Sequence, residues 1–271
     1  MMPALWDLTG RTALVTGAGS STGIGFAAAR ALADLGARVA ITSTTDRIHE
    51  RAEQLTASGC VARGFIADLT NVDQTRLLLE DVHAWVHSID NGVLDAGIDI
   101  LVNNAGMTSV TTPGVDEAGL VGEIDLGGWR DAMARNLDSA FLLSQSVLPG
   151  MVNSGWGRIV MVASVTGPVM AMRGEIAYAA AKAGMVGLTR ALAVDHAADG
   201  VTVNAVAPGW IATGSQTEHE AEQGRRTPMR RSGTPEEIAA AIAWLATPAA
   251  GYTTGQCLVV DGGNGIAEER A

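Results

Sequence analysis

Tyr178 and Lys182 are the two residues of this chain best suited to acid–base chemistry. Tyr178 is one of two tyrosines, and Lys182 is the single lysine beside seventeen arginines. If the segment is helical, positions i and i+4 lie on one face, one turn apart. A phenol ordinarily has a pKa of about 10, and a neighbouring ammonium favours its charged form. The pair therefore predicts a tyrosine that exchanges protons near neutral pH, unless the spacing is a coincidence in an arginine-rich composition.

Glycines crowd the segment from Thr16 to Gly25, which follows the first apolar run of the chain. Glycine lets the backbone approach a pyrophosphate, and a helix starting there offers free N–H groups and the positive end of its dipole. A plain strand-to-helix turn would also favour glycine, and Thr22 takes the third glycine's place in the usual GxGxxG spacing. We expect dinucleotide contacts from Gly17, Gly19, Ser21, Thr22, Gly23 and Ile24.

Short β-like runs alternate with helical patterns along nearly the whole chain. We expect strands at 11–16, 38–42, 61–67, 99–103, 158–163, 201–205 and 257–260. We expect helices at 24–35, 47–58, 71–88, 129–153 and 235–246, and one carrying Tyr178 and Lys182 that ends near Ala198. Several of the strand runs are apolar on both faces, as in strands covered by helices on each side. The alternation predicts one α/β domain, a doubly wound parallel sheet of the Rossmann type with about seven strands.

Further fragments stand in order around these two features. They are Asp68-Leu69, Asn103-Asn104-Ala105-Gly106, Asn136, Ser164, YAAAK at Tyr178–Lys182, Pro208-Gly209 and VDGG ending at Gly263. Together with TGAGSSTGIG at Thr16–Gly25, they make the chain resemble the short-chain dehydrogenase/reductase family from about Leu8 to Gly263. The chain looks most like the 3-oxoacyl reductase branch of that family.

The resemblance implies a role for four catalytic residues. Ser164 would donate a hydrogen bond to the substrate carbonyl, and Tyr178 would pass it a proton during reduction or remove one during oxidation. Lys182 would lower the pKa of the tyrosine and hold the nicotinamide ribose, and Asn136 would keep a water-mediated proton relay to Lys182. From the residues alone, Ser164 could instead cap a turn before Gly167, and Asn136 could be a solvated helix residue.

The resemblance also implies further contacts to the dinucleotide. They come from Asp68 and Leu69 at the adenine, from Asn104, Ala105 and Gly106 along the adenosine side, and from Pro208, Gly209, Ile211 and Thr213. Asp68 could instead belong to the N-cap region of the next helix. Two departures stand out: five residues separate Gly17 from Gly23 where the family usually has three, and the Ser164–Tyr178 spacing is one residue longer than usual. The extra pair in the loop could bulge outward or reshape the pyrophosphate contact.

The end of the second expected strand bears on the choice between NAD and NADP. NAD enzymes of this type place an acidic residue there, whereas this chain has Thr42-Ser43-Thr44-Thr45. The hydroxyls of Ser43 and Thr44 can donate to a 2′-phosphate that an acid would repel. Asp46 fits better as an acid in the first turn of the next helix, and Arg47 could reach the phosphate or simply be solvated. We predict NADP as the cofactor, with NAD as the less favoured choice.

The segment 211–231 takes the place of the family's substrate lid. Its basic residues, Arg225, Arg226, Arg230 and Arg231, could meet a phosphate of a carrier-linked substrate or pair with acids such as Glu236 and Glu237. No lysine or arginine lies between Arg135 and Arg158, so an acidic carrier protein would find little attraction there. A free ketone or secondary alcohol is the other candidate substrate. The residues expected to make its pocket apolar, with core packing as the alternative, are Met107, Val169, Met170, Met172 and Trp210.

Composition limits the remaining possibilities. A net charge of −11 argues against binding to nucleic acid or to an anionic membrane. The N-terminus lacks the pattern of a signal peptide, and Cys60 and Cys257 lie apart in apolar runs, as expected for reduced core thiols of a cytoplasmic protein. His83 and His87 share a helix face without a third ligand in view, and we predict no metal. The family resemblance implies a homotetramer.

The sequence therefore predicts a cytoplasmic NADPH-dependent reductase that converts a ketone into a secondary alcohol. The alternatives are an NAD-dependent secondary-alcohol dehydrogenase on the same scaffold and a non-catalytic protein that senses NADP. The complete set of Asn136, Ser164, Tyr178 and Lys182 argues against a sensor, because a sensor has no need of an acid–base pair.

Overall fold

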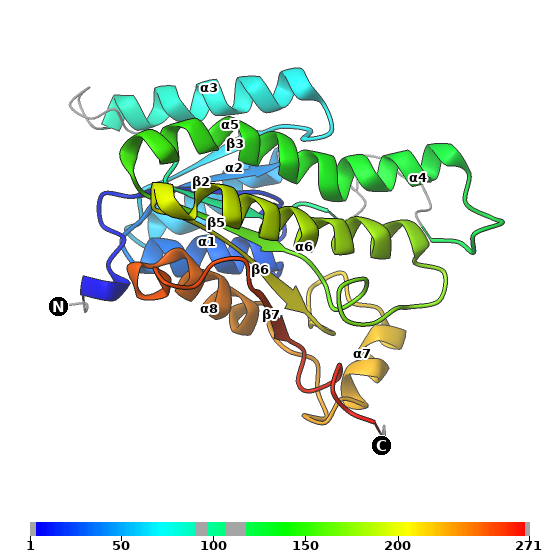
Figure 1. Ribbon diagram of the computed structural model, residues 1–271. Coiled ribbons are helices and arrows are strands. Elements are labelled where there is room, and N and C mark those ends of the chain that lie inside the picture. The colour runs from blue at the N-terminus through cyan, green and yellow to red at the C-terminus, as the bar shows by residue number, and fades with distance from the viewer. Residues whose placement is uncertain (1–3, 90–96, 107–117, 269–271) are drawn as a thin grey trace.

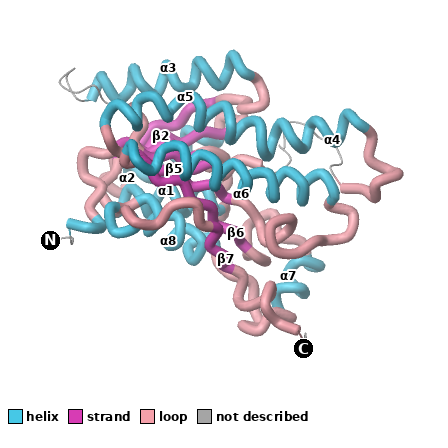
Figure 2. Tube along the Cα trace, viewed as in Figure 1, coloured by secondary structure: helices cyan, strands magenta, loops and turns pink. Residues whose placement is uncertain are grey.

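The sheet is parallel throughout and has seven strands in the order β3-β2-β1-β4-β5-β6-β7 (Figures 1 and 2). The computed structural model describes residues 4–89, 97–106 and 118–268 of the chain. The strands are β1 (Thr12–Val15), β2 (Arg38–Ser43), β3 (Ala62–Ile66), β4 (Ile100–Asn103), β5 (Gly157–Val162), β6 (Val201–Pro208) and β7 (Cys257–Val260). The predicted doubly wound parallel sheet is confirmed, and β6 is longer than expected.

Helices cover both faces of the sheet, as Figure 1 shows for α3, α5 and α6 on one side and α1 and α8 on the other. They are α1 (Ile24–Asp34), α2 (Arg47–Ala57), α3 (Val72–Ile89), α4 (Leu126–Met133), α5 (Ser139–Ser154), α6 (Ile176–His196), α7 (Glu218–Arg225) and α8 (Pro235–Ala246). One core cluster joins the sheet to α1, α2 and α8, and a second joins it to α3, α5 and α6. The apolar residues on both faces of β1, β2 and β4 are buried because each face has its own helical layer.

The long helix predicted at 129–153 is not continuous. A π-helical segment, Ala134–Asp138, separates α4 from α5. A π segment adds a residue to the turn and depends on tertiary packing, so the periodicity of the sequence could not reveal it. A second difference is α7, a short helix inside the segment expected to be the lid. Thr217 caps α7 by accepting from Glu220 N, while the Glu220 side chain accepts from Thr217 N.

Strand order reverses between β1 and β4, so the connections that leave these strands run in opposite directions along the sheet. Ligands of open parallel sheets bind in the crevice beyond the carboxyl ends of the strands at such a point. The predicted glycine loop, the Asn104–Gly106 segment, Ser164 and the Pro208–Thr213 segment lie at or just after the carboxyl ends of β1, β4, β5 and β6, whereas Asn136, Tyr178 and Lys182 lie in helical segments. The described part of the chain contains no helix with the length and apolar character that a bilayer span requires.

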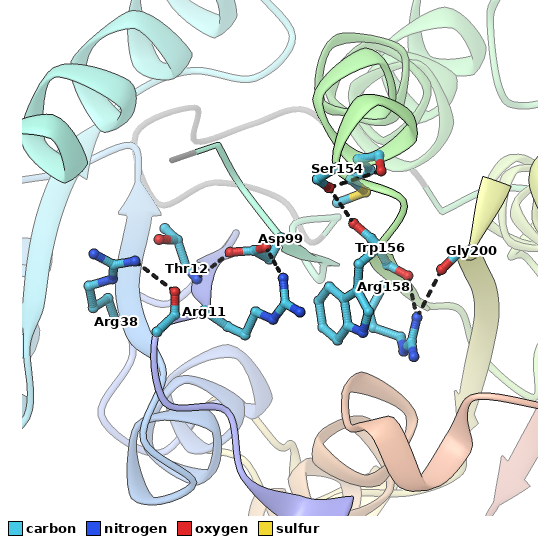
Figure 3. A network of polar contacts seen from close by, with 11 residues as sticks. Arg11, Thr12, Arg38, Asp99, Ser154, Trp156, Arg158 and Gly200 are labelled. Atoms are coloured by element: carbon cyan, nitrogen blue, oxygen red, sulfur yellow. Dashed lines mark hydrogen bonds and ion pairs between the residues drawn. The ribbon is translucent and has the colours of Figure 1, made fainter. Parts of the chain in front are cut away.

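The opposite, amino-terminal edge of the sheet carries a polar network of its own (Figure 3). Asp99 accepts hydrogen bonds from the Arg11 guanidinium and from Thr12 N, both at 2.8 Å. The ring of Trp156 lies next to two guanidinium groups, with its centroid 3.9 Å from Arg11 Cζ and 4.4 Å from Arg158 Cζ. Arg158 is only 5% exposed and donates to the carbonyl oxygens of Gly157, Gly200 and Thr247.

Candidate active site

The glycine loop is held tightly against the end of β4. A Cβ atom at Gly17, whose φ is +67°, would lie 2.9 Å from Ala105 Cα, and one at Gly25 would lie 2.5 Å from Asn104 Nδ2. Thr16 Oγ1 accepts from the backbone N–H groups of Asn104 and Ala105, each at 2.9 Å. Glycine is therefore required sterically at both positions, and the loop and the Asn104–Ala105 segment form one unit.

Thr16 is a structural residue that the sequence analysis treated only as the first letter of the motif. Its hydroxyl also donates to Val102 O at 3.3 Å, and its carbonyl oxygen accepts from Asn104 Nδ2 at 2.9 Å. One side chain thus ties β1 to β4 where their connections diverge. In the sequence, the signal for this structural role was a threonine directly before the first glycine of the loop.

The extra residues of the glycine loop form an outward turn. Gly23 N donates to Ser20 O at 3.2 Å, which closes a four-residue turn from Ser20 to Gly23. Ser20, Ser21 and Thr22 are exposed, whereas Ala18 and Gly19 are buried below them. The sequence left open whether the extra pair bulges outward or reshapes the pyrophosphate contact, and in the structure it bulges outward. The start of α1 is Ile24, two residues after Thr22.

The end of β2 brings hydroxyl groups and one arginine beside the loop. A Cβ atom at Gly19 would lie 3.0 Å from Ser43 Oγ and 3.9 Å from an Arg47 guanidinium nitrogen. Arg47 Nε donates to Thr45 Oγ1 at 3.1 Å, which orients the guanidinium. Thr44 is partly buried in the same turn, and Asp46 stands immediately before α2 without a side-chain capping bond. Arg47 is therefore near the glycine loop, although its side chain is exposed.

The end of β3 places Asp68 in an exposed turn and Leu69 in the core, at 7% exposure. Asp68 Oδ1 accepts from Thr70 N and from Thr70 Oγ1, at 2.9 and 2.7 Å. Asn71 Oδ1 accepts from Gln74 N and so caps the start of α3. Asp68 thus lies just before α3, as the alternative interpretation expected, but the side chain that caps the helix is that of Asn71.

Tyr178 and Lys182 lie one turn apart near the start of α6, as their spacing predicted. Lys182 Nζ lies 5.6 Å from the centroid of the Tyr178 ring and donates to Val162 O at 2.9 Å. Lys182 is 3% exposed, whereas Tyr178 is partly exposed. A buried ammonium needs such partners, and the bond to the end of β5 fixes its position at the carboxyl edge of the sheet.

Asn136 is fully buried in the π segment, so the alternative of a solvated residue is wrong. Its Nδ2 donates to Ala132 O at 3.0 Å, and its Oδ1 accepts no hydrogen bond within the described structure. A Cβ atom at Gly106 would lie 2.6 Å from Asn136 Oδ1 and 3.0 Å from Lys182 Nζ. The Asn136 amide, the Lys182 ammonium and the Gly106 backbone therefore meet at one point.

Ser164 follows β5 and is partly buried. Its Oγ accepts from Thr166 N at 3.1 Å, which agrees with the alternative of a turn before Gly167. That bond uses a lone pair of the oxygen and not the hydroxyl hydrogen, so the same hydroxyl can donate to a further group. Gly167, with a φ of +101°, packs against Ala179 O of α6 with no room for a Cβ atom. This contact fixes the loop that carries Ser164 against the helix that carries Tyr178.

The end of β6 approaches the C-terminal segment. A Cβ atom at Gly209 would lie 2.7 Å from Asp261 Cβ, and Gly209 N donates to Val260 O. Pro208 is the last residue of β6, and Ile211 and Thr213 follow it, both partly buried. Ile211 forms an isolated bridge with Gly233, so the two ends of the segment between them lie side by side.

Three of the four arginines in the expected lid pair with nearby acids. Arg225 contacts Glu218 and Glu222, Arg226 contacts Glu222, and Arg231 makes a bidentate pair with Glu237 at 2.6 and 2.7 Å. Arg230 has the left-handed φ of +57°. The pairing of Arg231 with Glu237 is the alternative that the sequence favoured over a phosphate site.

The remaining titratable candidates lie away from this point. Cys60 and Cys257 are free thiols, as predicted. Both are partly exposed, so the expectation that they are core residues is wrong. Burial raises the pKa of the Cys257 thiol. His83 and His87 are exposed on α3, and within the described residues no group of three histidine, cysteine or acidic side chains could hold a metal ion.

Comparisons with known proteins agree with this geometry. The family described as Enoyl-(Acyl carrier protein) reductase matches residues 17–264. The chain is 41% identical to the 3-oxoacyl-(acyl-carrier-protein) reductase FabG of Vibrio cholerae over 262 residues, which cover 95% of this chain and 98% of that protein. The chain belongs to the short-chain dehydrogenase/reductase family. Its members act on CH–OH and C=O groups, and this chain is an oxidoreductase of that kind.

Solved structures of short-chain dehydrogenases/reductases share the whole fold. One from Mycobacterium marinum is 32% identical, with a TM-score of 0.84 over 97% of this chain and 98% of that one. A gluconate 5-dehydrogenase from Burkholderia cenocepacia, in complex with NADP and tartrate, is 30% identical, with a TM-score of 0.84 over 97% of this chain and 98% of that one. These relatives act on different substrates, so the family alone does not name the substrate of this chain.

Proposed function

We propose that the protein reduces a ketone to a secondary alcohol with NADPH, and that it runs in reverse as an alcohol dehydrogenase. The proposal depends on the position of the Lys182 ammonium. This buried group lies 5.6 Å from the centroid of the Tyr178 ring and next to Gly106. A cation so close to a phenol favours the phenolate, which makes Tyr178 suited to proton transfer near neutral pH.

The carboxyl edge of the sheet fits a nicotinamide dinucleotide. Gly17, Gly19 and Gly25 leave no room for a Cβ atom, and the free N–H groups of α1 begin directly beyond the loop. The residues that would hold the rest of the dinucleotide are Asp68, Leu69, Asn104, Ala105, Gly106, Pro208, Gly209, Ile211 and Thr213. When bound, the nicotinamide supplies the hydride or accepts it.

Proton movement falls to the chain itself. During reduction, Tyr178 Oη donates a proton to the substrate oxygen. The resulting phenolate is then reprotonated by Lys182 Nζ. Asn136 Oδ1 is a buried acceptor with no partner in the described structure, so it is placed to hold a water next to Lys182. Ser164 donates its hydroxyl hydrogen to the same substrate oxygen and so stabilises the charge that develops there.

The preference for NADPH depends on the end of β2. Arg47 can neutralise a 2′-phosphate near Gly19, and Ser43 and Thr44 stand in place of an acid that would repel it. The Ser43 hydroxyl donates to Thr45 O at 3.0 Å and would have to turn to reach the phosphate. The gluconate 5-dehydrogenase with bound NADP supports the same choice. We expect Arg47→Ala to weaken NADPH binding about tenfold and leave NADH binding unchanged. Tighter binding of NADH than of NADPH by the unmodified protein would instead favour the NAD-dependent alcohol dehydrogenase.

The substrate is proposed to be a free ketone with an apolar body. Met170 and Trp210 are partly buried near Ser164 and the end of β6, and Val169 and Met172 present exposed apolar surface. Met107 lies outside the described residues. Consumption of NADPH with β-ketoesters, acyl thioesters, cyclic ketones and sugars would test this, and a preference for carrier-linked thioesters would show that the free-ketone proposal is wrong.

Tyr178→Phe is the direct test of the mechanism. Loss of the proton donor should lower kcat by about 10²–10⁴-fold, while the affinity for NADPH stays nearly unchanged. Tyr252→Phe is the matched control, because Tyr252 is fully exposed and should behave like the wild type. Normal turnover by Tyr178→Phe would exclude the proposed mechanism, and absence of turnover by the wild type with every ketone would favour the NADP sensor.

We further propose that the chain assembles as a homotetramer through α5 and α6. Phe141 and Val152 of α5 expose apolar side chains and line a hollow of about 350 Å³ together with Leu192 of α6, and Val194 of α6 is exposed as well. Sedimentation of the wild type and of Phe141→Glu would test this, and an unchanged sedimentation coefficient would exclude these helices as the interface. The cytoplasmic location stays a prediction that cell fractionation would test.

A further inference from the structure

The outward turn of the glycine loop touches the segment that follows β6. A Cβ atom at Gly214 would lie 2.5 Å from Thr22 Oγ1 and 3.7 Å from Thr22 Cβ. The first distance is shorter than any real contact of a Cβ atom, whereas the second is an ordinary van der Waals distance. The Thr22 hydroxyl therefore occupies the space that a side chain at position 214 would need.

This contact joins two walls of the proposed dinucleotide site. Thr22 stands two residues before α1, whose N-terminus is the proposed place of the pyrophosphate. Gly214 directly follows Thr213, which comes from the other side of the crevice. The segment 211–231 is tied to the scaffold at its base, because Ala212 N donates to Gly233 O and Gly233 N donates to Trp210 O. Further along, Met229 N donates to Gly262 O, and near its start the segment also contacts Thr22 through Gly214.

The contact depends on the feature in which this loop departs from the family. The turn from Ser20 to Gly23 contains the extra residues, and it raises Thr22 above the buried Ala18 and Gly19. We expect that a glycine loop without the two extra residues would not bring a side chain within contact distance of Gly214. The long loop and the glycine at position 214 are thus complementary in shape.

We propose that Thr22 is a positioning residue that seats the segment 211–231 over the dinucleotide and sets the rate at which the dinucleotide leaves. The inference rests on the proposed function, because it takes the glycine loop to be the pyrophosphate site. With the segment seated, Thr22 and Gly214 close the crevice across the N-terminus of α1. The two must part before a bound dinucleotide can escape, as for other segments that cover an active site.

Three variants test the complementarity. Gly214→Ala puts a methyl group in the space of the Thr22 hydroxyl, so either this side chain turns away or the walls part, and the contact is lost in both cases. The dissociation rate of NADPH should rise on the order of tenfold. Thr22→Ala removes the hydroxyl and should raise that rate about threefold, because the contact is loosened but not blocked. In Thr22→Ala/Gly214→Ala the new methyl group faces the residue-22 Cβ atom at the ordinary distance. The double variant should therefore release NADPH more slowly than Gly214→Ala alone.

The measurement is stopped-flow displacement of NADPH, followed by tryptophan fluorescence, beside the single-turnover rate of hydride transfer. The dissociation rate should change in the variants, and the single-turnover rate of Gly214→Ala at saturating NADPH should stay within about twofold of the wild type. Gly97→Ala is the matched control, since Gly97 lies before β4 with open space around its Cβ position. Melting temperatures of all variants show whether any of them has simply lost its fold.

Two failures can be told apart. Additive effects of the two substitutions, or a Gly214→Ala variant that releases NADPH like Gly97→Ala, would overturn this inference and leave the proposed function intact. A wild type that binds neither NADPH nor NADH would overturn the proposed function itself. If NADH proves to be the better ligand, the same displacement experiment with NADH tests the contact.

Discussion

The two edges of the sheet each bury a cation within the described structure, and they surround it differently. At the amino-terminal edge, the Arg158 guanidinium donates to three carbonyl oxygens and lies against Trp156. Burial lowers the pKa of Arg158 to about 10, and repulsion from Arg11 acts in the same direction. At the carboxyl edge, the Lys182 ammonium lies by a tyrosine ring and a buried amide oxygen that accepts no hydrogen bond from the described residues.

On the proposed function, this difference would place stability at one edge of the sheet and activity at the other. Around Arg158 and Asp99, polar groups satisfy one another and hold the amino-terminal ends of the strands in place, while Thr12 Oγ1 and Thr202 Oγ1 at the same edge lack hydrogen-bond partners in the described structure. Polar groups left with spare capacity, as at Asn136 and Ser164, cost some stability and remain available to a ligand. Substitutions at the two edges should therefore have opposite signatures, and the following experiments can break or sharpen that contrast.

The largest effect is expected at Lys182. Lys182→Met keeps much of the side-chain volume and removes the charge, so kcat/KM should fall by about 10²–10⁴-fold. The free energy of unfolding should change little, because removal of a buried charge together with its desolvation is often neutral. Steady-state kinetics and urea unfolding measure the two quantities. Lys182→Arg should not restore activity, because a forked guanidinium does not replace a compact ammonium.

Arg158→Met should show the reverse signature. Three carbonyl oxygens lose their donor, two of them in the buried residues Gly157 and Thr247, so the free energy of unfolding should fall by about 2–4 kcal/mol while kcat of the folded enzyme stays within about twofold. Arg76→Met is the control, since Arg76 makes an exposed pair with Glu80, for which we expect a loss of about 0.5 kcal/mol or less. A large fall in kcat for Arg158→Met would show that the two edges are not separable.

Asn136→Leu tests whether a polar group at the carboxyl edge contributes to kcat and not to the free energy of unfolding. The substitution removes the acceptor that lacks a partner, so stability should change by less than about 1 kcal/mol. Loss of the proposed water site should lower kcat about 10–100-fold and alter its dependence on pH. A pH profile of the same shape and height as that of the wild type would exclude Asn136 from the proton relay.

The smallest effect concerns Glu237 at the start of α8. Hydrogen bonds from Arg231 and from Thr234 N lower the pKa of Glu237 to about 2 from its ordinary value of 4.5. A carboxylate with a lowered pKa stabilises the fold above the unfolded-state value, and this contribution is lost as the pH falls through the folded-state value. The melting temperature of Glu237→Gln should therefore lie below that of the wild type by a constant small amount above pH 5. The gap should close between about pH 4.5 and 2, and a gap independent of pH would contradict the assignment.

Much of the scaffold followed from local patterns in the sequence. The strands predicted from apolar runs lie within a few residues of those observed, because the runs of β1, β4, β5 and β6 are buried on both faces, and even the partly exposed β3 and β7 keep short apolar runs. Tyr178, Lys182 and the glycine loop were found because helical spacing and the steric needs of a loop are local properties. The roles assigned to these residues stay proposals.

Other features depend on contacts between distant parts of the chain. The π segment that buries Asn136 packs with Leu137 against Gly184 of α6, and neither segment alone reveals that fit. The Asp99–Arg11 pair joins residues 88 positions apart, and Arg158 looked like an ordinary first residue of a strand. The helix α7 was missed because its charged sequence fits an exposed loop as well as a capped helix.

The paired ends of the segment from Ile211 to Gly233 have an evolutionary consequence. Two backbone hydrogen bonds between these ends close the excursion at its base, and inside it Met229 N donates to Gly262 O, so the segment is attached at its base and to the residues after β7. Loop length costs little free energy once such ends are joined. We therefore expect the part of this stretch between these attachment points to tolerate changes of length and sequence without redesign of the sheet.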